Sequence, residues 1–262
     1  MLIYFTYSCE NRMMNLWKMR INCLFLITLG LVISVNCLKL PNYITACSRS
    51  DPNLNECAVK NANDAISELV KGDKKYRIPA LNPLVIPEIL IDSNGQLRIQ
   101  LNNVHVYGLK NTVVTHMDID LKNQVLGASV SIPHLNIQAD YDVKGRILVL
   151  PINGEGPANI TAVNGVYTMH FKYSLFEKNG VKYGKIHDDS IEYHIKRAYF
   201  YLDNLFNGNK QLSEQMNQIL DDNWNEVLKD LGPAITTAVS AIVKQIFTAV
   251  LDHVPYDEIF LP

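Results

Sequence analysis

Alternating apolar and polar residues dominate the middle of the chain, from about residue 85 to residue 205. A period of two is typical of β-strands with one apolar and one solvent-facing side. The clearest runs are 97–101, 117–121, 135–143 and 167–175. Between such runs, Ser93-Asn94-Gly95, Asn164-Gly165 and Asn179-Gly180 offer residues that accept the positive φ angles of tight hairpins. The pattern predicts an antiparallel meander of long strands.

From residue 211 the apolar period becomes 3.6, which predicts a long helix over 211–252, interrupted at Gly232-Pro233. Between Pro233 and Leu251 the only charged residue is Lys244, and a helix apolar on nearly all sides is expected to be enclosed. A membrane span or lipid-anchor signal is the competing interpretation. The polar stretch 252–258 follows this helix, however, whereas an anchor signal ends in its hydrophobic tail. A shorter helix is predicted over 55–70.

These elements predict an α+β fold, in which a long, strongly curved antiparallel β-sheet is rolled around the long C-terminal α-helix. The sheet has one apolar face and the helix is apolar all round, so both are buried when the sheet curls about the helix. A sheet bent that strongly rarely closes on its helix without internal space. Such space, lined by apolar side chains, stays dry and accepts an apolar ligand. We therefore expect an enclosed apolar tunnel.

The N-terminal part carries an apolar run of 15 residues, 21–35, behind Lys18 and Arg20. This layout indicates a secretory signal peptide, because 15 residues are too few to span a bilayer as a helix. We assign 1–37 to an N-terminal extension with the signal peptide, and 38–262 to a single domain that is secreted and extracellular. Translation beginning at Met13, Met14 or Met19 stays open. Removal of 1–37 leaves two cysteines, Cys47 and Cys57, which an oxidising compartment is expected to join.

Charge disfavours several classes of partner. Without residues 1–37 the chain has 21 Lys and Arg against 25 Asp and Glu, a formal charge of −4. Nucleic-acid binding and attachment to anionic membranes both depend on clustered basic residues, which this chain lacks. We expect no nucleic acid and no stable membrane insertion.

Catalytic and metal-binding motifs are also missing from the sequence. It has no Gly-x-Ser-x-Gly elbow, no His-Glu-x-x-His and no phosphate-binding glycine loop. Seven histidines occur singly, without a second ligand at metal spacing. Asp118 and Asp120 share one strand face, but that face is expected to be solvated. We expect no enzyme, no metal site and no cofactor. Asn159-Ile160-Thr161 is the sole N-glycosylation sequon, and it suits a sugar if the strand directs Asn159 outward.

The inward strand positions and the enclosed helix supply the candidate ligand-binding residues: Leu135, Ile137, Tyr141, Tyr167, Met169, Phe171, Ile242 and Phe247. Ordinary core packing is the alternative for each of them, because period-two apolar positions fill the core of any sheet. Tyr141 and Tyr167 are the more informative pair. An inward phenol needs a hydrogen-bond partner, and an ester, acid or epoxide oxygen of a ligand is suited to that role.

Several segments, in this order and spacing, resemble the insect takeout and juvenile hormone-binding protein family. They are Ile44-Thr45-Ala46-Cys47, Leu54-Asn55-Glu56-Cys57, Ile78-Pro79-Ala80-Leu81-Asn82-Pro83-Leu84, Gly154-Glu155-Gly156, Ala158-Asn159-Ile160 and Val254-Pro255-Tyr256-Asp257-Glu258-Ile259-Phe260. The resemblance covers 38–262 and implies a curved sheet rolled around a long helix, with an elongated tunnel for a lipid-like ligand. The chain departs from the family at Asn82, where an acidic residue commonly precedes the proline.

Two functions from different classes follow as hypotheses. The first is a soluble extracellular carrier that encloses a terpenoid hormone, fatty acyl chain or related lipid. The second is an extracellular interaction or signalling protein that uses the same roll with a core filled by side chains. A cell-surface or carrier-type partner protein is left open by both.

The secreted protein is predicted to begin near Leu38 and to carry a Cys47–Cys57 disulfide. Peptide mapping under non-reducing conditions tests both points in one experiment. Free thiols at these two positions in the secreted protein would contradict the bridge.

Overall fold

The computed structural model describes residues 38–93, 95–147 and 149–262. Residues 1–37, on which the signal-peptide and domain-boundary predictions rest, lie outside the described residues. In chain order the elements are β1 (Cys47–Ser48), α1 (Leu54–Leu69), η1 (Lys74–Tyr76), β2 (Leu84–Ser93), β3 (Leu97–Tyr107), η2 (Leu109–Asn111), β4 (Val113–Asp120), β5 (Val125–Ile147), β6 (Leu150–Lys178), β7 (Val181–Leu202), η3 (Phe206–Gly208), α2 (Lys210–Asp222), α3 (Trp224–Leu251), α4 (Tyr256–Ile259) and β8 (Phe260–Leu261).

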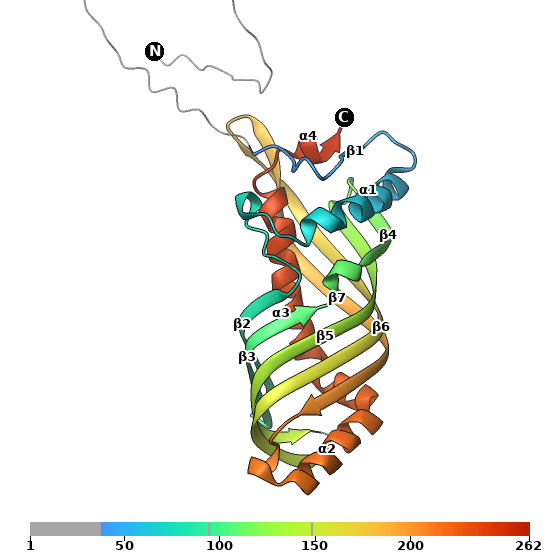
Figure 1. The fold of residues 1–262 in the computed structure, drawn as a ribbon. Helices are drawn as coiled ribbons and strands as arrows, with labels where there is room; N and C mark the ends of the chain where they lie inside the picture. Colours follow the sequence, from blue (N-terminus) through green and yellow to red (C-terminus); the bar gives the residue numbers. More distant parts are fainter. Residues whose placement is uncertain (1–37, 94, 148) are drawn as a thin grey trace, which may run out of the picture.

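The main sheet is antiparallel, with strand order β2-β3-β5-β6-β7 and with β4 beside the N-terminal part of β5. Figure 1 shows this sheet curled in front of α3, with α1, β1 and α4 at the upper end and α2 at the lower end. Strands β5, β6 and β7 have 23, 29 and 22 residues and run along most of the molecule. The predicted meander of long strands and the α+β class are confirmed.

One predicted turn is wrong. Asn164 has a positive φ of 52°, but it lies inside β6, which continues to Lys178. The neighbouring register pairs place Pro133 of β5 and Lys196 of β7 opposite Asn164. At this row, the inward positions of all three strands switch between even and odd residue numbers. We call Pro133, Asn164 and Lys196 the waist row.

The waist row keeps apolar side chains on the concave face in both halves of the long strands, because all three strands reverse their alternation there while their pairing register stays unchanged. The buried side chains form three clusters, of which the smallest is Tyr76, Ile78 and Val254. The upper core includes Met169, Phe171, Tyr173, Leu251 and Tyr256. The lower core includes Tyr141, Val143, Leu205, Leu220 and Val227.

The C-terminal helix differs from the prediction in its continuity. The chain forms two helices, α2 and α3, which are separated at Asn223, whose side-chain amide donates to the Ile219 carbonyl at 2.8 Å. Within α3 the axis bends by 58° between Trp224–Gly232 and Ile235–Leu251. The bend confirms the interruption predicted at Pro233, since proline lacks the amide hydrogen for an intrahelical bond.

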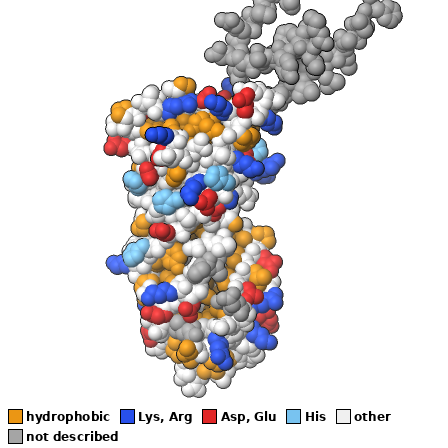
Figure 2. Space-filling model, turned by 180° about the vertical axis from the view of Figure 1, so that it is seen from behind, with side chains coloured by type: hydrophobic (Ala, Val, Ile, Leu, Met, Phe, Trp, Pro, Cys, Tyr) orange, Lys and Arg blue, Asp and Glu red, His pale blue; other side chains and the backbone are white. Residues whose placement is uncertain are grey.

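Helix α3 also differs in its degree of enclosure. It packs against β7 and β2, the two edge strands of the main path, and so closes the open side of the curled sheet. The helix contacts the two edge strands with one side only, and among the described residues no element packs on its other side. That outer side is exposed at Thr237, Val239, Ala241 and Gln245. Figure 2 shows hydrophobic side chains reaching the surface on this back face.

Membrane-spanning potential is limited in the part of the chain described. There, no helix taken singly has the length and apolar character needed to cross a bilayer, and the two arms of α3 meet that test only as a bent pair.

At the upper end, α1 covers the free edge of β4. The Asn63 side chain accepts from the Val114 amide and donates to the Val114 carbonyl, both at 2.9 Å. Asn55 accepts from the Ile119 amide at 3.0 Å. These bonds satisfy edge groups that would otherwise be open for pairing. The predicted Cys47–Cys57 disulfide is confirmed and ties the segment before α1 to its first turns.

The seam between α3 and β7 is held by polar groups. Asp189 of β7 accepts hydrogen bonds from Ser240 and from Lys244, whose Nζ lies 2.6 Å from Asp189 Oδ1. Farther down, the Tyr193 hydroxyl donates to the Leu228 carbonyl at 3.0 Å. The hydrogen bond from Lys244, followed by that from Ser240, lowers the pKa of Asp189 below its usual value.

Replacing Asp189 with Asn should destabilise the fold in a pH-dependent way. A depressed folded-state pKa contributes stability above the unfolded value of about 3.9 and loses it as pH falls through the folded value. Because Lys244 retains 35% side-chain exposure, we expect about 1 kcal/mol at neutral pH, or about 2–4 °C in Tm. Thermal unfolding across pH 2–7 should show the deficit shrinking at acidic pH.

Asp188→Asn is the matched control, because its Lys172 partner is well exposed and the pair is worth less. A deficit for Asp189→Asn that stays constant across the pH range would argue against the ion pair as its source.

Candidate functional site

The eight predicted ligand-binding residues all lie on the concave side or on α3, but they divide between the two cores. Met169 and Phe171 belong to the upper core, against which Phe247 packs. Tyr141 belongs to the lower core, against which Leu135, Ile137 and Ile242 pack. Tyr167 belongs to neither core. The structure therefore assigns seven of these residues to the two cores or to their margins and leaves Tyr167 outside both.

Phe171 and Phe247 join β6 to α3 in the upper core. Their ring centroids are 4.7 Å apart, and Phe171 is only 1% exposed. Two aromatic rings at this distance make a favourable contact beyond the area they bury. The pair is thus one of the contacts that hold α3 against the sheet within the upper core.

Tyr141 already has a hydrogen-bond partner within the protein. Its hydroxyl donates to the Asp203 carbonyl at 2.6 Å. Burial raises the pKa of Tyr141 to about 12, so the phenol keeps its proton. The hydroxyl thus ties β5 to the segment after β7, and it has no need of a ligand.

Tyr167 is different. Its hydroxyl oxygen is buried and has no hydrogen-bond partner among the described residues. Burial, with a smaller contribution from Tyr193, raises the pKa of Tyr167 to about 12. Leaving a buried hydroxyl unpaired costs about 1–3 kcal/mol. This is therefore a donor in the interior that lacks an acceptor.

The position of the Tyr167 ring depends on Gly165, two residues back on the same face of β6. A Cβ atom at Gly165 would lie 2.6 Å from the Tyr167 hydroxyl oxygen and 2.7 Å from a ring carbon. Both distances are far inside van der Waals contact, so only glycine leaves room for this ring. Gly165 directly follows Asn164 of the waist row.

The side chains around Tyr167 are packed less completely than those of either core. Val130 of β5 and Tyr193 of β7 are its register partners, and Ile191 and Ile195 share the inward face with Tyr193. All four are half-buried, as is Ile242 of α3. Val130 and Ile191 also adjoin the upper core, and Ile242 adjoins the lower core. We call Tyr167, Val130, Ile191, Ile195 and Ile242 the middle zone. Apolar side chains that face inward yet keep accessible surface can pack against an additional apolar molecule.

Sequence reasoning missed Asp189 and Tyr193, which fix α3 to β7 beside the middle zone. A signal existed for the first of these, since Lys244 is the single charge between Pro233 and Leu251 and requires a partner if it faces the sheet. On the convex side, Asn159 is exposed on β6. The described residues hold no group of three or more His, Cys, Asp or Glu arranged to bind a metal ion.

Comparisons with known proteins agree with this architecture. The "Circadian clock-controlled protein daywake" of Drosophila yakuba is 30% identical over 216 residues, which cover 78% of this chain and 83% of that protein. Its Drosophila melanogaster counterpart is 26% identical and covers 90% of this chain and 96% of its own. A Schistocerca gregaria protein named for beta-carotene binding is 24% identical over 123 residues, 46% of this chain and 49% of that protein.

A solved structure and a family model give the same result. The crystal structure of Epiphyas postvittana Takeout 1 matches with a TM-score of 0.76 and 26% identity, covering 84% of this chain and 100% of the other. The family model described as "Haemolymph juvenile hormone binding protein" matches residues 24–261. With nearly the whole chain matched, and with the curled sheet and C-terminal helices in place, this protein belongs to the haemolymph juvenile hormone binding protein family.

Proposed function

We propose that this protein is a secreted carrier that binds a small hydrophobic ligand between the curled sheet and α3, centred on the middle zone. The observation that carries the proposal is the Tyr167 hydroxyl, a buried donor without an acceptor among half-buried apolar side chains. A ligand there would complete the hydrogen bond and cover the remaining apolar surface. At roughly 25 cal/mol per Å², that burial favours binding without a charged anchor.

The ligand class follows from this chemistry. Its body is apolar and elongated, as in a terpenoid or a fatty acyl chain, because the middle zone lies between two packed cores along the length of the strands. It carries one acceptor oxygen, such as an ester, acid or epoxide oxygen, at the height of Tyr167. The raised pKa of Tyr167 keeps its proton in place at physiological pH, so this residue donates.

The predicted residues take different roles under this proposal. Leu135, Ile137 and Ile242 form apolar walls that adjoin the lower core. Met169, Phe171 and Phe247 close the upper end. Tyr141 supports the lower end through its bond to Asp203, and the polar contact with ligand is assigned to Tyr167 alone.

Secretion is part of the proposal. The apolar run 21–35, the confirmed disulfide and the haemolymph family support it. A carrier role without catalysis is in keeping with the family and with the absence of a catalytic motif in the sequence. The alternative, an interaction protein with a filled core, fits the middle zone less well, because a filled core would bury these side chains and pair the Tyr167 hydroxyl.

The direct test is native mass spectrometry and solvent extraction of the secreted protein, combined with titration of a fluorescent fatty-acid probe. A carrier should retain extractable lipid or bind the probe with saturation. A protein that contains no lipid and binds no apolar probe would leave the interaction function as the better account.

Tyr167→Phe should have two opposite effects. It removes an unpaired buried hydroxyl, so the ligand-free protein should keep or gain thermal stability. It should also weaken binding of an oxygen-bearing ligand by roughly 2- to 12-fold relative to its hydrocarbon analogue, the value of one hydrogen bond. Competition against the fatty-acid probe measures this ratio.

Tyr141→Phe is the matched control, because the same atom is removed from a hydroxyl that is already paired. It should lower Tm and leave the ligand ratio unchanged. An equal change of ligand ratio in both variants would show that Tyr167 has no special contact with the ligand.

Gly165→Ala should impair binding by moving the Tyr167 ring, since the new methyl group would overlap the phenol. Overpacking of this kind costs about 1–3 kcal/mol of stability, and probe affinity should fall as the ring shifts into the middle zone. Gly127→Ala, whose methyl group would meet Asp118 and His170 instead, serves as the control. Calorimetry and probe titration on both variants check the result, and unchanged probe affinity for Gly165→Ala would place the ligand elsewhere.

A further inference from the structure

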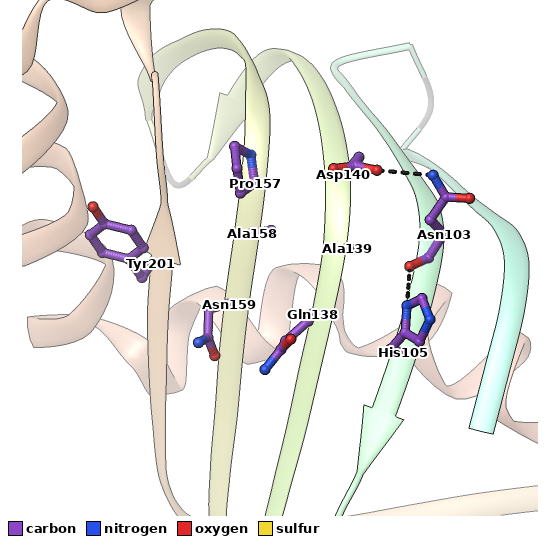
Figure 3. A pocket seen from close by; sticks show the side chains of 9 residues that line it. All are labelled: Asn103, His105, Gln138, Ala139, Asp140, Pro157, Ala158, Asn159 and Tyr201. Atoms are coloured by element: carbon purple, nitrogen blue, oxygen red, sulfur yellow. Dashed lines mark hydrogen bonds between the residues drawn. The ribbon is translucent and has the colours of Figure 1, made fainter. Parts of the chain in front are cut away.

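The convex face of the sheet has a groove of about 500 Å³ around the sequon residue Asn159. Register pairs align four outward residues in one row across the sheet: His105 of β3, Gln138 of β5, Asn159 of β6 and Tyr201 of β7. Figure 3 shows the Asn159 and Gln138 side chains lying beside one another, with Tyr201 on one side of them and His105 on the other. Directly paired residues on one face have Cβ atoms about 5 Å apart.

The hydrogen bonds of this face hold Asn159 in one orientation. Asn136 donates to Asn159 Oδ1 at 2.6 Å and to Thr161 Oγ1 at 2.9 Å, and Gln138 donates to Asn136 at 3.0 Å. The Oδ1 atom is therefore engaged, whereas Nδ2 finds no partner among the described residues. Nδ2 is the atom that carries the sugar in N-glycosylation.

Tyr201 supplies an aromatic surface next to that atom. It is 57% exposed, although large aromatic side chains usually cover much of their surface. The flat apolar face of a pyranose ring packs well on such a phenol. Gln138 and Asp140, on the opposite side of Asn159, offer an amide and a carboxylate to sugar hydroxyl and acetamido groups. A second hollow of about 490 Å³ shares Asp140 and Pro157 with the groove and extends it along the strands.

We propose that this protein carries an N-linked glycan at Asn159 and that the glycan lies in this groove, with its first N-acetylglucosamine packed against Tyr201. In the attachment step, Asn159 Nδ2 forms a bond to the anomeric carbon of a lipid-linked oligosaccharide. The bond from that carbon to the donor's pyrophosphate oxygen breaks, the lipid pyrophosphate leaves, and the amide gives up one proton. The inference rests on the proposed function only in requiring passage through the secretory pathway.

Attachment is tested on the full chain secreted from insect cells. Intact mass before and after treatment with peptide N-glycosidase should show loss of one oligosaccharide. Asn159→Gln should secrete without that mass, and Thr161→Ser should retain it. Secreted wild-type protein that shows no such mass overturns the proposal. Binding of the fatty-acid probe is measured on the same sample and reports on the carrier function separately.

Packing of the glycan against Tyr201 is tested by the rate at which the glycosidase releases the glycan from the native protein. A glycan packed on Tyr201 should be released slowly, and Tyr201→Ala should shorten the half-time severalfold. Tyr107→Ala is the matched control, because Tyr107 is an exposed tyrosine on the same face of the sheet but lies on β3, three strands from Tyr201 on β7. Denatured samples should show equal rates for all variants. Equal rates for the native proteins would mean that the glycan is attached but extends freely into solvent, which would overturn the proposed packing in the groove.

Discussion

The constraint on which the structure depends is the waist row, Pro133, Asn164 and Lys196. A strand of 29 residues with an unbroken period of two would keep one face inward along its whole length. The apolar residues of this chain change from even to odd positions on β5 and β6, and in the reverse direction on β7. Because these three changes lie opposite one another, all three strands reverse their alternation at the same height in the sheet. The concave face is therefore apolar both above and below the row.

The waist row also locates the middle zone. Gly165 follows Asn164, and it leaves the space that the Tyr167 ring occupies. Other tyrosine hydroxyls of the interior are paired within the protein: Tyr173 with Tyr256 at 2.9 Å, Tyr193 with Leu228, and Tyr141 with Asp203. Among the described residues, only the Tyr167 hydroxyl and Asp252 Oδ1 are buried without a partner. Burial raises the pKa of Asp252, which lies at the end of α3 and outside the middle zone.

Local patterns predicted most of the fold because they report on local forces. Alternation identified the long strands, and Asn179-Gly180 was correctly expected to form a hairpin, with φ angles of 55° and 78°. Asn164-Gly165 has the same Asn-Gly sequence, but it lies within β6. The difference comes from pairing with β5 and β7 on both sides, which the local sequence does not report. The exposed side of α3 likewise depends on where the sheet edges lie, which periodicity does not report.

The candidate site was predictable as a set of inward residues but not in its chemistry. Tyr141 and Tyr167 look alike in the sequence, since both occupy inward positions of alternating runs. Their difference lies in a carbonyl at Asp203, 62 residues from Tyr141 along the chain. The waist row separates the two tyrosines in space as well, because it divides the lower core from the zone above it. Strand β6 thus presents Tyr167 to the interior above the row and Asn159 to solvent below it, because its alternation reverses at Asn164.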